Sequence, residues 1–195
     1  MRGKERFEAA LAPLAVRIPA GPNWLTLLAV LVMAVAAWFV LQGSFALAAL
    51  LVIISGFIDM LDGTVAKAQN RASAWGAILD RVGDRISDAL IFGSVVIAGL
   101  VQLWLGLAVL VLVMLGSYVS ACLEAATKTK IGEKLSMRAV RLILLAAALL
   151  LAGFVDYPVL DCALSIIALL AIFALAQRLW AARKILKEQR SAKPI

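Results

Sequence analysis

The chain has 195 residues, 64% of them hydrophobic, and its 19 basic and 12 acidic residues give a formal net charge of +7. Because soluble domains average about 45–50% apolar residues, this composition indicates a membrane protein. The absence of histidine excludes histidine metal ligands, histidine general bases and Ser-His-Asp triads.

The first twenty residues begin with charged side chains and continue as a mildly amphipathic segment. Their basic side chains suit an anionic headgroup layer, so residues 1–20 are predicted to form an interfacial amphipathic helix, with a frayed tail as the alternative. Six apolar runs follow, each bounded by a turn or a polar link. They predict six transmembrane helices over residues 22–41, 45–66, 74–98, 104–125, 139–154 and 159–180.

The predicted fold is an all-α integral membrane protein with a single domain over residues 1–195. It comprises the interfacial helix, a six-helix transmembrane bundle over 22–181 and a basic tail over 182–195. Lys and Arg are concentrated at both ends of the chain and in the links after the second and fourth spans, and the three opposite turns contain none. The positive-inside rule therefore predicts that both termini are cytoplasmic.

Four aspartates interrupt the apolar sequence where the second predicted span ends and the third begins. Asp59 and Asp62 are three residues apart, and Asp80 and Asp84 are four apart, so each pair lies on one helix face. Ionised groups at membrane depth are costly and usually functional. Clustered carboxylates suit hard cations such as Mg²⁺ or Mn²⁺, and two such ions could hold a diphosphate. The alternative is a set of ion pairs with nearby arginines. Asp88 is expected to form a structural pair with a basic residue, with tuning of the metal shell as the alternative.

Small residues accompany the aspartates. Gly63 and Ala66 follow Asp62, and Gly76 precedes the second pair, so a nucleotide or phosphate could approach the backbone closely there. Lys67 is a candidate phosphate contact.

These residues form the pattern Asp-x2-Asp-Gly-x2-Ala-Lys-x8-Gly-x3-Asp-x3-Asp, at Asp59, Asp62, Gly63, Ala66, Lys67, Gly76, Asp80 and Asp84. The pattern resembles the signature of the CDP-alcohol phosphotransferase family. Seven of eight fixed positions match with every spacing intact, and Lys67 stands where the family has arginine.

The resemblance implies a role for each matched residue. Asp59, Asp62, Asp80 and Asp84 would bind two divalent cations, Mg²⁺ or Mn²⁺, and Asp84 would also act as the general base on the acceptor hydroxyl. The donor pocket would be lined by Gly63, Ala66, Lys67 and Gly76. The segment at 22–26 resembles the Pro-Asn-x-x-Thr entry to the family's first span, so Asn23 and Thr26 are donor-site candidates, with helix capping equally open.

Acceptor selection is expected outside this motif. Basic residues cluster around the link between the fourth and fifth spans, where they could bind a phosphorylated acceptor or serve topology and anionic-lipid attraction. The segment 117–141 resembles the inositol-phosphate branch of the family, although Ser120 and Cys122 stand where that branch usually has arginines. The acceptor-site candidates are Arg85, Ser117, Lys128, Lys130, Lys134, Arg138 and Arg141.

The resemblance implies transfer of a phosphatidyl-type group from CDP-diacylglycerol or CDP-archaeol to an alcohol, with release of CMP. Inositol phosphate is the preferred acceptor, and the alternatives are glycerol phosphate, serine or another alcohol. CDP-inositol is an alternative donor. We expect a homodimer in the cytoplasmic membrane, with the site facing the cytoplasm and no nucleic-acid partner. The alternative class is a cation transporter that uses the aspartates.

Overall fold

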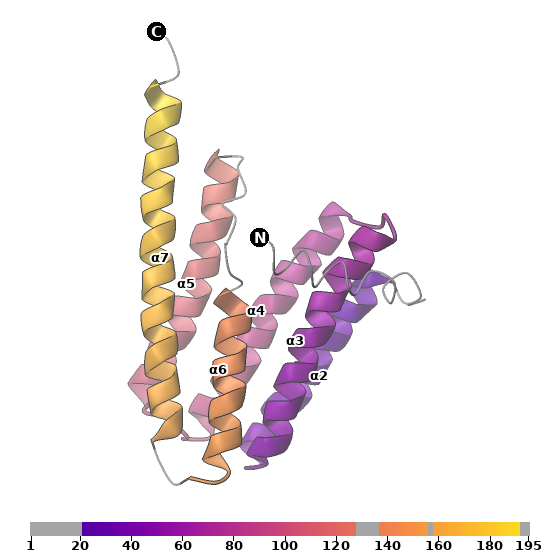
Figure 1. Cartoon of the computed structure of the whole chain (residues 1–195), viewed down its shortest axis with the longest axis vertical. Coiled ribbons are helices and arrows are strands. Elements are labelled where there is room, and N and C mark those ends of the chain that lie inside the picture. The colour runs from indigo at the N-terminus through magenta and orange to yellow at the C-terminus, as the bar shows by residue number, and fades with distance from the viewer. Residues whose placement is uncertain (1–20, 128–136, 156–157, 192–195) are drawn as a thin grey trace.

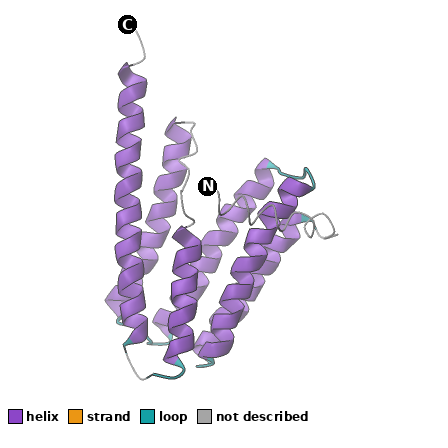
Figure 2. Ribbon diagram, in the orientation of Figure 1, coloured by secondary structure: helices purple, strands orange, loops and turns teal. Residues whose placement is uncertain are grey.

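The computed structural model describes residues 21–127, 137–155 and 158–191, and within these ranges the regular structure is helical (Figures 1 and 2). The helices are α2 (Pro22–Leu41), α3 (Phe45–Ala68), α4 (Ala74–Ile97), α5 (Leu103–Thr127), α6 (Met137–Ala152) and α7 (Val159–Ser191). They begin and end close to the expected boundaries, and α7 continues beyond residue 180. The interfacial helix expected over 1–20 lies outside the described residues.

The number of membrane spans predicted from the sequence is wrong. Four helices are long and apolar enough to cross a membrane, namely Pro22–Leu41, Phe45–Ala68, Leu103–Ala126 and Val159–Lys187. The third expected span corresponds to α4, where five charged residues between positions 80 and 88 fall within every 18-residue window of the helix. The fifth corresponds to α6, which has only 16 residues. Two of the six expected spans are therefore not candidate membrane spans: α4 because it carries too many charged residues, and α6 because it is too short.

The six helices form a closed ring. Each makes its main contacts with two others, in the order α2, α3, α6, α7, α5, α4 and back to α2. Most of the interior is apolar, with Met33, Ile91, Phe92, Leu145 and Leu164 at most 1% exposed. Large apolar side chains also cover the outer faces, as expected for helices surrounded by lipid.

Three helices end in the same kind of turn. After α2 and α4, Gly43 and Gly99 adopt positive φ angles of 73° and 66°. After α3 this place is taken by Asn70, with φ 53°. There Arg71 N–H donates to the Ala66 carbonyl at 2.9 Å and Asn70 N–H to the Lys67 carbonyl at 3.2 Å, the hydrogen-bond pattern of a Schellman motif.

Candidate active site

The aspartates are brought together by the tight connection between α3 and α4. Ser73 caps α4 by accepting a hydrogen bond from Gly76 N–H at 3.0 Å, immediately after the Schellman turn that ends α3. The chain thus reverses within a few residues, at the upper end of the bundle in Figure 1. The end of α3 and the beginning of α4 therefore lie on the same side of the molecule.

Three of the four aspartates meet closely. Asp59 and Asp62 from α3 and Asp80 from α4 each offer a carboxylate oxygen, and these atoms lie within 4.8 Å of one another. Three converging carboxylate oxygens form the hard donor set that Mg²⁺ and Mn²⁺ prefer. The residues present therefore fit the divalent cation expected from the sequence.

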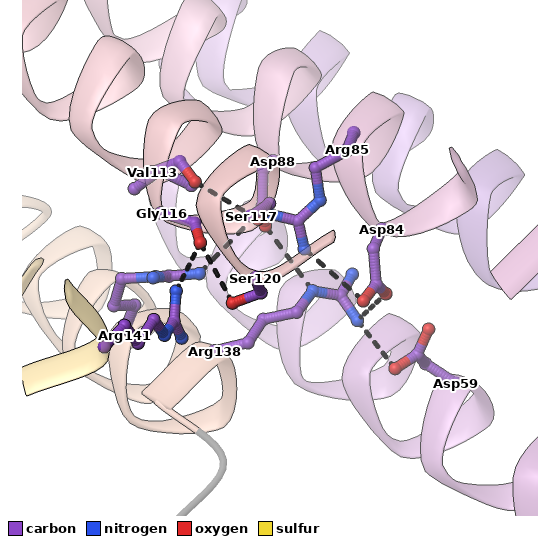
Figure 3. A network of polar contacts seen from close by, with 11 residues as sticks. Asp59, Asp84, Arg85, Asp88, Val113, Gly116, Ser117, Ser120, Arg138 and Arg141 are labelled. Carbon is purple, nitrogen blue, oxygen red and sulfur yellow. Dashed lines mark hydrogen bonds and ion pairs between the residues drawn. The ribbon is translucent and has the colours of Figure 1, made fainter. Parts of the chain in front are cut away.

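Asp84 lies beside this trio and is joined to it by Arg138 of α6. One guanidinium nitrogen, Arg138 Nη1, contacts Asp59 Oδ2 at 2.6 Å and also pairs with Asp84 Oδ1. Arg85 Nη2 lies 3.4 Å from Asp84 Oδ2 (Figure 3). The ion-pair alternative is thus realised in part, chiefly through an arginine far away in sequence.

Charge does not balance within this group. If all five are ionised, the carboxyl groups of Asp59, Asp62, Asp80, Asp84 and Asp88 carry two more charges than the guanidinium groups of Arg85, Arg138 and Arg141 can balance. A divalent cation would neutralise that excess. The electrostatics therefore agree with the donor geometry.

Burial also affects the carboxyl groups of α4, which is not one of the candidate spans. It raises the pKa of Asp84 to about 7; the Arg138 guanidinium opposes this shift and the nearby Asp59 carboxylate adds to it. Burial likewise raises the pKa of Asp80, and the Asp84 carboxylate contributes. An acid with a pKa close to the working pH is well suited to accepting and releasing a proton.

Of the donor-site candidates, Thr26 contacts the aspartate trio directly. Thr26 of α2 is buried and its hydroxyl donates to Asp62 Oδ2 at 2.5 Å. The Asn23 amide oxygen lies 3.2 Å from where a Cβ on Gly76 would be, so α2 and α4 are close there. A Cβ on Gly63 would meet nothing within 4 Å, which leaves open space beside Asp62. Ala66 and Lys67 lie one turn beyond Gly63 on α3, and Lys67 is exposed.

The acceptor-site candidates fall into two groups. Arg85, Ser117, Arg138 and Arg141 come together from α4, α5 and α6, and the Arg85 guanidinium donates to the Ser117 hydroxyl (Figure 3). By contrast, Lys128, Lys130 and Lys134 lie outside the described residues.

Two members of this network were not predicted as site residues from the sequence. Asp88 was expected to pair with a basic residue, and it pairs with three arginines. Arg178 of α7 reaches into the bundle, where its Nη1 donates to the Gly116 carbonyl of α5 at 2.6 Å. The available signal for Arg178 was a lone charge within an apolar run, which usually marks a polar interior.

Comparison with known proteins places most of the helical region in one family. The family model described as CDP-alcohol phosphatidyltransferase matches residues 20–180. Archaetidylinositol phosphate synthase of Methanothermobacter thermautotrophicus is 36% identical over 86% of this chain and 85% of its own length. Phosphatidylinositol phosphate synthase of Corynebacterium glutamicum is 34% identical over 94% of this chain and 89% of its own.

Solved structures agree with the sequence relatives. Phosphatidylinositol phosphate synthase of Mycobacterium tuberculosis with CDP-DAG bound has a TM-score of 0.73 and 26% identity, covering 93% of this chain and 94% of that chain. The same enzyme with manganese and citrate has a TM-score of 0.75 and 26% identity, covering 90% and 88%.

Proposed function

The chain belongs to the CDP-alcohol phosphatidyltransferase family and is a transferase of phospholipid synthesis; we propose that it uses a CDP-linked lipid as donor and inositol phosphate as acceptor. The observation that supports this most strongly is the convergence of the aspartates from α3 and α4 at the family's motif spacing. Membership of the family also removes the support for a cation transporter.

The choice of acceptor is supported by the charge beside the aspartates. Arg85 and Arg138 pair with Asp84, and Arg141 lies 3.7 Å from Asp88, one turn further along α4. Guanidinium groups bind phosphate oxygens in bidentate fashion. The relatives named above are an archaetidylinositol phosphate synthase and a phosphatidylinositol phosphate synthase. We therefore assign the acceptor phosphate to this arginine side of the site and the donor lipid to CDP-diacylglycerol or CDP-archaeol.

In the proposed site, Asp59, Asp62, Asp80 and Asp84 hold two divalent cations, Mg²⁺ or Mn²⁺. When bound, the cations stabilise negative charge on the diphosphate and on the departing CMP. Asn23, Thr26, Gly63, Ala66, Lys67 and Gly76 line the donor pocket. The open space beside Gly63 is consistent with close approach of the cytidine diphosphate.

The reaction is a displacement at the β-phosphate of the donor. The acceptor hydroxyl oxygen forms a bond to that phosphorus, and its proton passes to the Asp84 carboxylate. The bond between the β-phosphorus and the bridging oxygen breaks, and CMP leaves with the electron pair. Arg85, Arg138 and Arg141 hold the acceptor phosphate so that its hydroxyl faces Asp84.

We further propose that the aspartate end of the bundle faces the cytoplasm, in the cytoplasmic membrane. Basic residues gather at this end, whereas the connections 42–44, 99–102 and 153–158 at the other end contain no Lys or Arg. We also propose that residues 1–195 form a single domain and that the protein is a homodimer. The exposed apolar side chains Leu103, Trp104, Leu107 and Val111 of α5 offer a face for the second copy.

An acceptor panel tests this proposal. Purified protein in detergent with CDP-diacylglycerol and Mn²⁺ is expected to release CMP with inositol phosphate, and far less with inositol, glycerol phosphate or serine. A parallel panel with CDP-archaeol separates the two lipid classes. CMP release that depends on glycerol phosphate or serine instead would contradict the acceptor assignment and leave the reaction class intact.

A further inference from the structure

Asp88 occupies the centre of the polar network. It lies on α4 one turn beyond Asp84, and only 1% of its surface is exposed. Arg85 Nη1 lies 3.2 Å from its Oδ2, Arg141 Nη2 3.7 Å from the same oxygen, and Arg138 Nε 3.5 Å from Oδ1. Figure 3 shows these side chains converging from two helices on one carboxylate.

Arg138 connects this hub to the aspartates expected to bind metal. Its Nη1 contacts Asp59 and Asp84, whereas its Nε faces Asp88. The two ends of one guanidinium therefore lie on different carboxylates. A cation bound by Asp59 and Asp84 would compete with the Nη1 contacts, whereas the Nε contact with Asp88 would not be affected directly.

We propose that Asp88 is a positioning residue that retains Arg138 at the edge of the aspartate cluster when Asp59 and Asp84 engage a cation. The inference rests on the cation site of the proposed function. Without Asp88, the carboxylates that pair with Arg138 in the described part of the chain are Asp59 and Asp84. Arg138 would then compete with the cation for both of them.

The geometry predicts a distinct effect on metal affinity. Changes to residues that orient metal ligands typically weaken metal binding by about 10–100-fold. Asp88→Asn is expected to raise the apparent Kd for Mn²⁺ by about 10-fold, because Arg138 then remains on Asp59 and Asp84. Arg138→Gln is expected to lower this Kd, because the guanidinium group that competes with Mn²⁺ for Asp59 and Asp84 is removed.

A double-mutant cycle tests the inference. Mn²⁺ binding to the full-length protein is measured from the electron paramagnetic resonance signal of the free ion, for wild type, Asp88→Asn, Arg138→Gln and the double variant. If Asp88 acts through Arg138, Asp88→Asn has no further effect in the Arg138→Gln background. A loss of the same size in both backgrounds would mean that Asp88 acts only by its charge, and would overturn the proposal, as would an unchanged Kd in Asp88→Asn.

Asp88→Glu is a second variant in case Asp88→Asn does not fold, since Asp88→Asn leaves the buried Arg141 without this counter-charge. The longer side chain keeps the charge and moves the carboxylate, so it is expected to give a smaller rise in Kd that again disappears with Arg138→Gln. If Asp88→Asn does not fold, the test rests on Asp88→Glu. A folded Asp88→Glu protein with an unchanged Kd for Mn²⁺ would overturn the positioning role. If the wild-type protein binds no Mn²⁺, the cation site of the proposed function is wrong. If it binds Mn²⁺ but the effects of the two substitutions are additive, only the role proposed for Asp88 is wrong.

Discussion

Asp84→Asn is expected to lower kcat for acceptor-dependent CMP release by about 10³-fold or more. Removing a general base typically costs about 10²–10⁴-fold, and Asp84 is also an expected cation ligand. Asparagine has nearly the same shape as aspartate but cannot accept the acceptor's proton. The Arg138 contact with Asp84 also loses its charge, although Asp59 retains Arg138 at 2.6 Å. CMP release at saturating donor and acceptor measures the effect.

Asp161→Asn is the matched control. Asp161 lies in the first turn of α7 and accepts a hydrogen bond from Gln102 N–H at 3.0 Å, in the same region as the turn that follows α4 and away from the α3–α4 connection. This variant is expected to keep wild-type turnover. If Asp84→Asn is folded and retains more than about a tenth of wild-type kcat, Asp84 does not act as the general base.

Removal of divalent cations is expected to abolish turnover. Without them, the excess of carboxylates over guanidinium groups leaves negative charge that repels the donor diphosphate. CMP release is measured after dialysis against EDTA and again after Mg²⁺ or Mn²⁺ is added back. Both hard cations should restore it, because the converging ligands are carboxylate oxygens.

The same experiment has a structural readout. A cation that binds the folded cluster stabilises the folded protein by mass action, so the midpoint of thermal unfolding should rise with the concentration of Mn²⁺. In Asp62→Asn this rise should be smaller, because Asp62 is one of the three converging ligands. Full turnover in EDTA, with no thermal effect of Mn²⁺, would contradict metal-dependent catalysis.

The helix boundaries could be predicted from the sequence because local chemistry determines them. Gly43 and Gly99 supply the positive φ angles that end two helices, and Ser73 caps the helix that carries Asp80 and Asp84. The spacing of the aspartates also predicted their shared helix faces. The membrane assignment failed in α4 because the residues that make the site are the charges that exclude it from the candidate spans.

Contacts between distant helices could not be predicted from the sequence. Arg138 is 79 residues from Asp59 and 50 from Asp88, so only the folded ring of helices shows that it pairs with both. The hydrogen bond from Thr26 to Asp62 spans 36 residues. Local periodicity places each side chain on a helix face, but the neighbour of that face depends on how the helices pack.

We propose that the aspartates of α3 and α4 hold the catalytic divalent cations. A crystal of the protein grown with Mn²⁺ and diffraction data collected at the manganese absorption edge test it most directly. We expect anomalous density between Asp59, Asp62, Asp80 and Asp84, and its loss in Asp62→Asn. Anomalous density elsewhere, with none between these carboxylates under conditions that support CMP release, would show that they do not hold the catalytic cations.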